Sequence, residues 1–338
     1  MSGPVRLGLE EAERLAFDAL AASRTAPDNA LATARALVAA EADGQKGHGL
    51  SRVPSYAAQA RVGKVDGFAK PAVDRVAPSV LRIDAAHGFA YPALDLAIDR
   101  LSALAPEQGI AMASLHRSHH FGQAGRTVER LAERGLVALI FGNSPKAMAF
   151  WGGRAPMMGT NPIAFACPVP DAPPLVVDMA LSEVARGRIM AADKAGETIP
   201  EGWALDPQGN PTTDPKAALK GSMLPIGGAK GSALALMVEV LAVALTGGNY
   251  GWEATSLLDA EGGPPGLGHT ILAIDPGPAS GGAYPSRMAE LARAVALDAG
   301  TRFPGTRRLE NRARAAKEGV TLPPALHAEI RAILDGAA

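Results

Sequence analysis

The spacing of apolar residues changes twice along the chain, and this change constrains the fold most strongly. Up to about residue 75, apolar side chains such as Leu9, Leu15 and Leu20 recur at helical intervals. From about Ala77, short apolar runs bounded by Gly and Pro replace them, as is typical of strands. Helical spacing returns after Pro285. The sequence therefore predicts an α/β protein, in which a helical domain (1–76 and 285–338) brackets a central α/β domain (77–284).

The apolar runs also predict individual elements. We expect strands at 79–84, 110–115, 136–141, 162–166, 175–177 and 270–274, and helices at 93–104, 128–134, 289–297 and 325–334. The longest apolar run, 231–245, is shorter than the ~20 residues of a membrane span, and Glu239 interrupts it. We therefore predict a core helix there, apolar on nearly all sides, and no membrane association.

Composition excludes several classes of function. The chain has 33 Lys and Arg residues against 34 Asp and Glu residues, a formal net charge of −1, whereas nucleic-acid binding through phosphates needs clustered basic residues. The only cysteine, Cys167, excludes an intramolecular disulfide framework and a cysteine-based zinc cage. The first fifteen residues lack the apolar stretch of a signal peptide. We expect a cytoplasmic protein.

The phosphate-binding fingerprints of common nucleotide-binding folds are absent from the sequence. No G-x-G-x-x-G occurs, and Gly227-Gly228-Ala229-Lys230-Gly231-Ser232 has K-G-S where a P-loop needs G-K-S/T. This glycine-rich turn enters a predicted helix, so its backbone N–H groups and Lys230 suit an anion such as a cofactor phosphate. A plain strand–helix connection explains the same residues equally well.

Histidine is the most promising chemical group. His48 lies between two glycines, and Arg52 follows four positions later, so a helix starting there places both on one face. Arg binds a carboxylate through two parallel hydrogen bonds, and His can deliver a proton. The alternative is a histidine at a helix start beside a surface arginine.

A second histidine cluster follows the strand expected at 110–115. In it His119 and His120 are adjacent, and on an extended segment they point in opposite directions. No H-E-x-x-H accompanies them, so we predict no metal site. Asp178 follows an apolar strand and suits either a ligand site or a turn cap.

Six segments in this order resemble the malate/L-lactate dehydrogenase family, which lacks a Rossmann fold. They are His48-Gly49-Leu50-Ser51-Arg52, Ser118-His119-His120-Phe121-Gly122, Gly159-Thr160-Asn161-Pro162, Ile199-Pro200-Glu201-Gly202, Pro211-Thr212-Thr213-Asp214-Pro215 and Gly227-Gly228-Ala229-Lys230-Gly231. The resemblance implies a non-Rossmann α/β fold, a nicotinamide cofactor, a small 2-imino or 2-oxo acid as substrate and a homodimer.

Within that family, the segments 230–234 and 245–249 look most like the Δ1-piperideine-2-carboxylate/Δ1-pyrroline-2-carboxylate reductases. The likeness implies that His48 donates the proton and that Arg52 and Thr160 bind the substrate. It assigns to the cofactor His120, Asp178, Met179, Ala180, Arg186, Ala229, Lys230, Pro304, Gly305, Thr306, Arg307, Arg308 and Leu309. Arg307 and Arg308 suit the 2′-phosphate of NADPH, with NADH as the alternative cofactor.

The sequence departs from the imine-reductase pattern at two positions. The resemblance implies a relay of Ser, His and Asp in those enzymes, and here Gly47 stands at the Ser position and Arg188 at the Asp position. A cation beside an iminium substrate is unfavourable by about 4 kcal/mol at ~4 Å and an effective dielectric constant near 20. The lead expectation is hydride transfer to C2 of a cyclic 2-imino acid. A 2-hydroxy-acid dehydrogenase acting on a 2-oxo acid is the alternative, followed by a non-catalytic ligand-binding protein.

Overall fold

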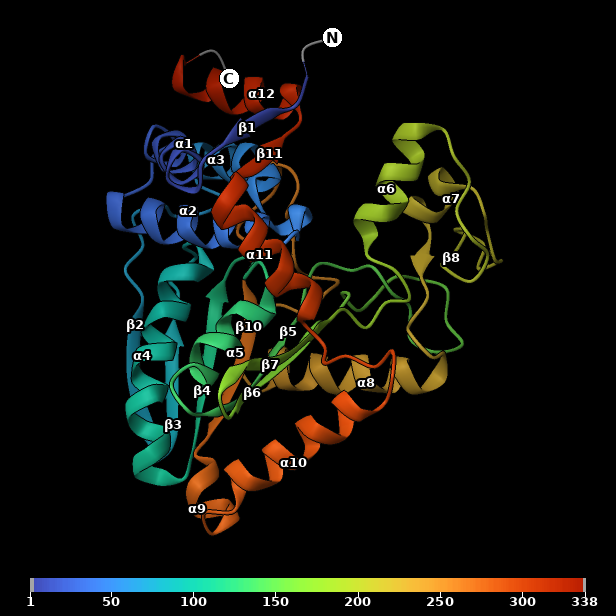
Figure 1. The fold of residues 1–338 in the computed structure, drawn as a ribbon. Helices are drawn as coiled ribbons and strands as arrows, with labels where there is room; N and C mark the ends of the chain where they lie inside the picture. The colour runs from blue at the N-terminus through green and yellow to red at the C-terminus, as the bar shows by residue number, and fades with distance from the viewer. Residues whose placement is uncertain (1–2, 337–338) are drawn as a thin grey trace.

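The computed structural model describes residues 3–336, and within them seven strands form one mixed sheet (Figure 1). Their order across the sheet is β2 (Ala72–Ala77), β3 (Val80–Asp84), β4 (Ile110–Ser118), β10 (Leu267–Ile274), β5 (Val137–Gly142), β6 (Ile163–Val169) and β7 (Ala172–Met179). Strands β3 and β4 run parallel, and the other neighbouring pairs are antiparallel. All six predicted strands are confirmed. Strand β2 lies in a region predicted to be helical, and its residues are mostly exposed at the sheet edge.

Helices cover both faces of the sheet, and this explains why its central strands are apolar. Helices α4 (Ala90–Gln108) and α5 (Ala124–Ala132) pack on one face, where Ile98, Leu131 and Ile140 are fully buried. The other face is contacted by α8 (Ala229–Glu239) and the π-helical turn η3 (Val240–Ala244) that continues it. Strands buried on both sides consist of near-continuous hydrophobic runs.

The expectation that 231–245 is apolar because it is buried on nearly all sides is wrong for the single chain. The inner side of α8 and η3 packs on β5 and β10, but Leu236, Met237, Val240 and Leu245 are each between 43 and 52% exposed. The segment therefore presents an apolar outer face to solvent.

The two chain ends meet above the sheet (Figure 1). Helices α1 (Leu9–Ala21), α2 (Pro27–Ala42) and α3 (Val53–Val62) pack with α11 (Thr306–Glu318) and α12 (Pro324–Leu334), while β1 (Val5–Leu7) pairs with β11 (Val320–Leu322). Helix α10 (Tyr284–Leu297), which follows the short α9 (Pro276–Ser280), contacts β6 instead, and the hydroxyl of Tyr284 donates to the carbonyl of Pro168 at 3.0 Å. The division into two domains stays a prediction.

A small lobe stands beside the sheet and was not predicted as regular structure. It contains α6 (Arg186–Ala195), α7 (Pro215–Lys220) and the short strands β8 (Ala204–Leu205) and β9 (Ser222–Met223) (Figure 1). Helix α6 buries only Ile189, so its sequence carries little helical periodicity. Among residues 3–336, no helix is long and apolar enough to cross a membrane.

Candidate active site

One edge of the sheet collects most of the predicted site residues. Strands β4, β5 and β7 end at this edge, and β6 begins there. The reason is that β4 and β5 are both antiparallel to β10, while β6 is antiparallel to both β5 and β7. His120 follows β4, Thr160 precedes β6, and Asp178 and Met179 end β7. Segments far apart in the sequence are thus placed side by side by the topology.

His48 and Arg52 approach from the helical region, on two 3₁₀ turns, η1 (Lys46–His48) and η2 (Leu50–Arg52), which precede α3. Glu41 fixes the turns, since its Oε2 accepts the N–H of Leu50 at 3.0 Å. Arg52 Nε donates to the carbonyl of Gly47 at 2.7 Å. The His48 ring stacks on His120, with ring centroids 5.2 Å apart and planes at 20°. The structure therefore brings His48, Arg52 and His120 together.

The electrostatics of this cluster favour an anionic ligand beside a neutral imidazole. Burial, reinforced by the Arg52 guanidinium, lowers the pKa of His48 to about 4. Burial and the same guanidinium also lower the pKa of His120 well below its usual range. Among the described residues, Arg52 Nη1 and His48 Nδ1 are buried without a hydrogen-bond partner. Such donors are costly to bury unless a ligand engages them.

Gly47 and Arg52 line a cavity of about 500 Å³ that Met190 of α6 and Leu258 also border. Arg188, which replaces the expected acidic residue, is exposed on α6 two positions before Met190. Of these two residues of α6, only Met190 lines the cavity. Gly47 supplies no hydroxyl near His48, as the sequence predicts.

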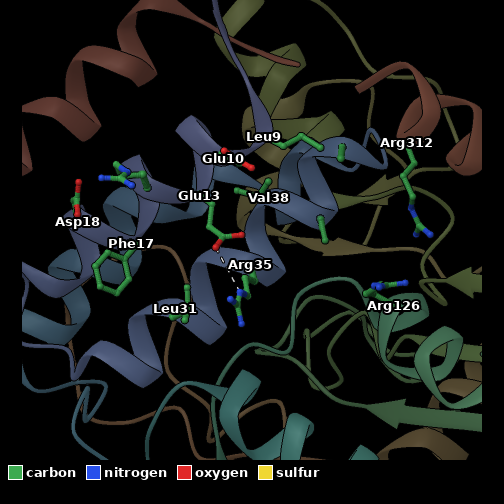
Figure 2. Close-up of a pocket in the computed structure, with 13 residues that line it drawn as sticks. Leu9, Glu10, Glu13, Phe17, Asp18, Leu31, Arg35, Val38, Arg126 and Arg312 are labelled. Carbon is green, nitrogen blue, oxygen red and sulfur yellow. Dashed lines mark ion pairs between the residues drawn. The ribbon is translucent and has the colours of Figure 1, made fainter. Parts of the chain in front are cut away.

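A larger cavity, of about 820 Å³, lies between α1, α2, α5 and α11 (Figure 2). Its walls include Phe17, Leu31 and Val38, and four arginines also line it, namely Arg14, Arg35, Arg126 and Arg312. Arg35, Arg126 and Arg312 are each paired with a carboxylate. It contains no histidine. No histidine lines the cavity at Arg52 either, and it is the candidate substrate cavity because Arg52 and Gly47, the residue before His48, line it.

The segments assigned to the cofactor converge near the end of β7. Thr160 O accepts the N–H of Leu181 at 2.8 Å, and Leu181 O accepts the N–H of Ile226 at 2.9 Å. This places the turn before Ala229 and Lys230 beside Asp178–Ala180. Gly228 has a φ of +67°, which glycine adopts without strain, and an added Cβ would lie 3.3 Å from the Trp151 ring. The α8 N-terminus and the exposed Lys230 thus form a cradle suited to phosphate.

The C-terminal turn of the predicted cofactor site also reaches β7, since a Cβ on Gly305 would lie 3.2 Å from the carbonyl of Val176. Arg308 is only 7% exposed. Its Nη1 and Nη2 donate to Glu129 at 2.8 Å each, and Nη1 also donates to Asp43 at 3.3 Å. Arg308 is therefore occupied by these carboxylates, and we keep the expected phosphate contact only for the exposed Arg307. The role of Arg307 stays a prediction.

The remaining predicted residues are placed as follows. Arg186 is half-buried, and its Nη2 donates to Leu219 O at 3.4 Å within the small lobe. Pro304, Thr306 and Leu309 surround the start of α11. Among the described residues, no group of three or more His, Cys, Asp or Glu side chains could hold a metal ion.

Two groups at the site were not predicted. Tyr56 of α3 is fully buried, and its hydroxyl lies 2.6 Å from His120 Nδ1. Its place four residues after Arg52, on the same helical face, was the available signal. Asn161 has a φ of +41°, and its amide donates to Glu239 at 2.6 Å, which fixes the turn that carries Thr160. No local pattern pairs those two residues.

Comparison with known proteins shows the family of the chain. The family model described as malate/L-lactate dehydrogenase matches residues 7–331. A "(2R)-3-sulfolactate dehydrogenase (NADP(+))" of Chromohalobacter salexigens is 52% identical over 96% of this chain and 97% of its own. A "Delta(1)-pyrroline-2-carboxylate/Delta(1)-piperideine-2-carboxylate reductase" of Pseudomonas putida is 46% identical over 84% and 83%.

Solved structures agree as well. The Δ1-piperideine-2-carboxylate reductase of Pseudomonas syringae pvar. tomato superposes with a TM-score of 0.92, at 36% identity and with 97% of this chain and 99% of that one covered. The non-Rossmann fold and the family predicted from six ordered motifs are thereby confirmed. The chain belongs to the malate/L-lactate dehydrogenase family of NAD(P)-dependent oxidoreductases.

Proposed function

We propose that this enzyme catalyses hydride transfer from NADPH to C2 of a small carboxylate that carries a C=N or C=O bond at that carbon. The observation that carries this proposal is the buried, unpartnered Arg52 Nη1 next to the neutral His48. Arg52 binds the substrate carboxylate, and Thr160 contacts the substrate from the sheet edge. Because both are held by backbone contacts, C2 is oriented at little further entropic cost.

The residues around β7 fit a nicotinamide cofactor. Asp178–Ala180, the cradle at Ala229 and Lys230, and Arg307 offer hydrogen-bonding groups and positive charge for its ribose and phosphates. When bound, NADPH supplies the hydride. NADPH is favoured over NADH by Arg307, whose guanidinium matches a 2′-phosphate, and by the NADP(+) in the name of the Chromohalobacter relative.

His48 transfers the proton that must accompany the hydride. Its lowered pKa has burial and Arg52 as causes, so a substrate carboxylate paired with Arg52 cancels part of the second cause and raises the protonated fraction. In the reverse direction, the neutral imidazole accepts a proton from a hydroxyl or amine.

A cyclic 2-imino acid is the first candidate substrate, since the Pseudomonas putida and Pseudomonas syringae relatives are named for such substrates. We thus propose a Δ1-piperideine-2-carboxylate/Δ1-pyrroline-2-carboxylate reductase.

A 2-oxo acid with a second anionic group is the second candidate, and Arg188 favours it. This exposed arginine lies on α6, the helix whose Met190 borders the cavity, and we propose that it binds a sulfonate or second carboxylate of the substrate. The relative at 52% identity is named for sulfolactate, which carries a sulfonate in addition to its carboxylate.

Two variants test the proposal in an assay of NADPH oxidation. The first tests His48, and the second separates the two candidate substrates. His48→Gln is expected to abolish turnover while leaving NADPH affinity, followed by fluorescence, unchanged. Arg188→Asp restores the acidic residue that the imine reductases carry, so it is expected to raise kcat/KM for a cyclic imine and to lower it for a sulfonated 2-oxo acid. Near-normal turnover in His48→Gln overturns the proposal.

We also propose a cytoplasmic homodimer in which the exposed apolar face of α8 and η3 is covered by a second copy. Leu236, Met237, Val240 and Leu245 form this face, and exposed apolar patches of this kind mark interaction sites. Light scattering on the purified protein is expected to give twice the chain mass, and Leu236→Glu is expected to shift it toward the monomer.

A further inference from the structure

The missing relay leaves open what orients the His48 ring. Gly47 offers no hydroxyl, and His48 Nδ1 is buried without a hydrogen-bond partner. The ring contact that remains is the stack on His120, 5.2 Å away and nearly parallel. The plane of His48 therefore depends on the plane of His120.

His120 is in turn held by two buried tyrosines from different elements. The Tyr56 hydroxyl of α3 lies 2.6 Å from His120 Nδ1 and 3.2 Å from the Tyr91 hydroxyl of α4. Tyr56 is fully buried, and Tyr91 and His120 are 6 and 8% exposed. Gly122 leaves room for this arrangement, because a Cβ there would lie 2.6 Å from the Tyr91 hydroxyl. Three polar groups thus form one line that ends at the ring stacked on His48.

The protonation of these groups leaves two directions for the hydrogen bond: either Tyr56 donates to His120 Nδ1, or Nδ1 donates to Tyr56. Burial raises the pKa of Tyr56 to about 12, so it stays a phenol, and burial also lowers the pKa of His120, so its ring is neutral at pH 7. A neutral imidazole has one donor nitrogen and one acceptor nitrogen. With Tyr91 donating to Tyr56, the Tyr56 proton is directed at His120 Nδ1, and the ring proton lies on Nε2.

We propose that Tyr56 is a positioning residue, which fixes His120 as the Nε2–H tautomer and thereby holds the His48 ring in the plane needed for proton transfer. This role rests on the proposed function, because it acts through His48. It takes the place of the hydroxyl that Gly47 lacks. Tyr56 itself does not touch the substrate.

Nitrogen-15 NMR of histidine-labelled protein tests the tautomer without any assay of activity. The His120 signals, identified by their absence in His120→Gln, are expected to show an acceptor Nδ1 and a protonated Nε2 in the wild type. In Tyr56→Phe, which keeps the ring but removes the hydroxyl, a mixture of tautomers is expected. A protonated Nδ1 in the wild type, or an unchanged tautomer in Tyr56→Phe, overturns the proposal.

Kinetics of the same variant then separate positioning from a merely structural role. We expect Tyr56→Phe to lower kcat about tenfold, less than the ~100-fold cost of a 1 Å misplacement, with the KM for NADPH unchanged. Tyr284→Phe, which removes a hydroxyl of α10 that donates to the carbonyl of Pro168 in β6, is the matched control and is expected to keep wild-type kcat. A wild type that turns over no substrate refutes the proposed function alone, since the NMR result still decides the tautomer. An unchanged kcat in Tyr56→Phe refutes the positioning role alone.

Discussion

Replacing Arg308 by Met is expected to lower the free energy of unfolding, because Arg308 belongs to a buried ion-pair cluster. Glu129 and Asp43 are 1 and 3% exposed, and Arg308 and Arg312 both donate to each of them. This buried ion-pair cluster joins α11 to α5 and to the end of α2. Its Asp43 lies shortly before the turn that carries His48. Without Arg308, Arg312 must neutralise both buried carboxylates, and Arg126 helps it only at Glu129.

The magnitude follows from the carboxyl of Glu129. Burial raises its pKa, but hydrogen bonds from Arg308 and Arg312 outweigh burial and lower the pKa from 4.5 to about 2. At ~1.4 kcal/mol per pKa unit, the arginines favour the ionised form by ~3 kcal/mol. Removing one partner of a buried ion pair costs about 3–5 kcal/mol in general. We therefore expect Arg308→Met to lose about 3 kcal/mol.

Calorimetry or denaturant unfolding measures this loss, with the exposed neighbour Arg307→Met as control. An unfolding entropy of ~2.1 cal/mol/K per residue over 338 residues converts about 3 kcal/mol into a fall in Tm of about 4 °C at pH 7. Because the folded pKa of Glu129 is depressed, this stabilisation is complete above pH 4.5 and is lost as the pH falls toward 2. The gap between wild type and variant should shrink on acidification. Equal Tm values for the two variants at pH 7, or a gap that widens in acid, refute the reasoning.

Two further predictions concern the cofactor and the proton. Arg307→Ser is expected to weaken NADPH binding about tenfold, the value of ~1.4 kcal/mol, and to leave NADH binding unchanged; titration of both cofactors measures this, and an equal loss for both contradicts a phosphate contact. With a 2-oxo acid, kcat/KM for reduction is expected to fall tenfold per pH unit between pH 5 and 8, since the protonated form of His48, with a pKa of about 4, is the donor in the free enzyme. A profile flat over that range excludes His48 as the donor.

The fold was largely predictable because the central strands are buried on both faces. Each of the six apolar runs bounded by Gly and Pro became a strand. Strand β2 escaped prediction because an edge strand with exposed side chains lacks that signature. For 231–245, apolarity alone does not distinguish burial in the chain's own core from a face that a second copy covers. Leu236 and Met237 are exposed in the single chain, and their burial by a second copy stays a proposal.

The roles of the site residues stay predictions from the sequence, whereas the contacts among them come only from the structure. Spacing alone left His48 and Arg52 with two interpretations, and family resemblance favoured the functional one. The bond between Tyr56 and His120 joins residues 64 positions apart, so only the tertiary fold creates it. Arg307 and Arg308 are chemically identical, and the ~100° between successive residues of α11 decides that one is exposed while the other is buried with Glu129.

The central claim, hydride transfer to C2 at the His48–Arg52 site, is tested most directly by following NADPH absorbance. Wild-type protein is mixed with Δ1-piperideine-2-carboxylate, oxaloacetate, pyruvate or the 2-oxo acid of sulfolactate at matched concentrations. We predict rapid oxidation with at least one of them, with the cyclic imine fastest for a ketimine reductase and an oxo acid fastest for a 2-hydroxy-acid dehydrogenase, and its loss in His48→Gln. NADPH binding without oxidation by any of the four would contradict the account and indicate a ligand-binding protein.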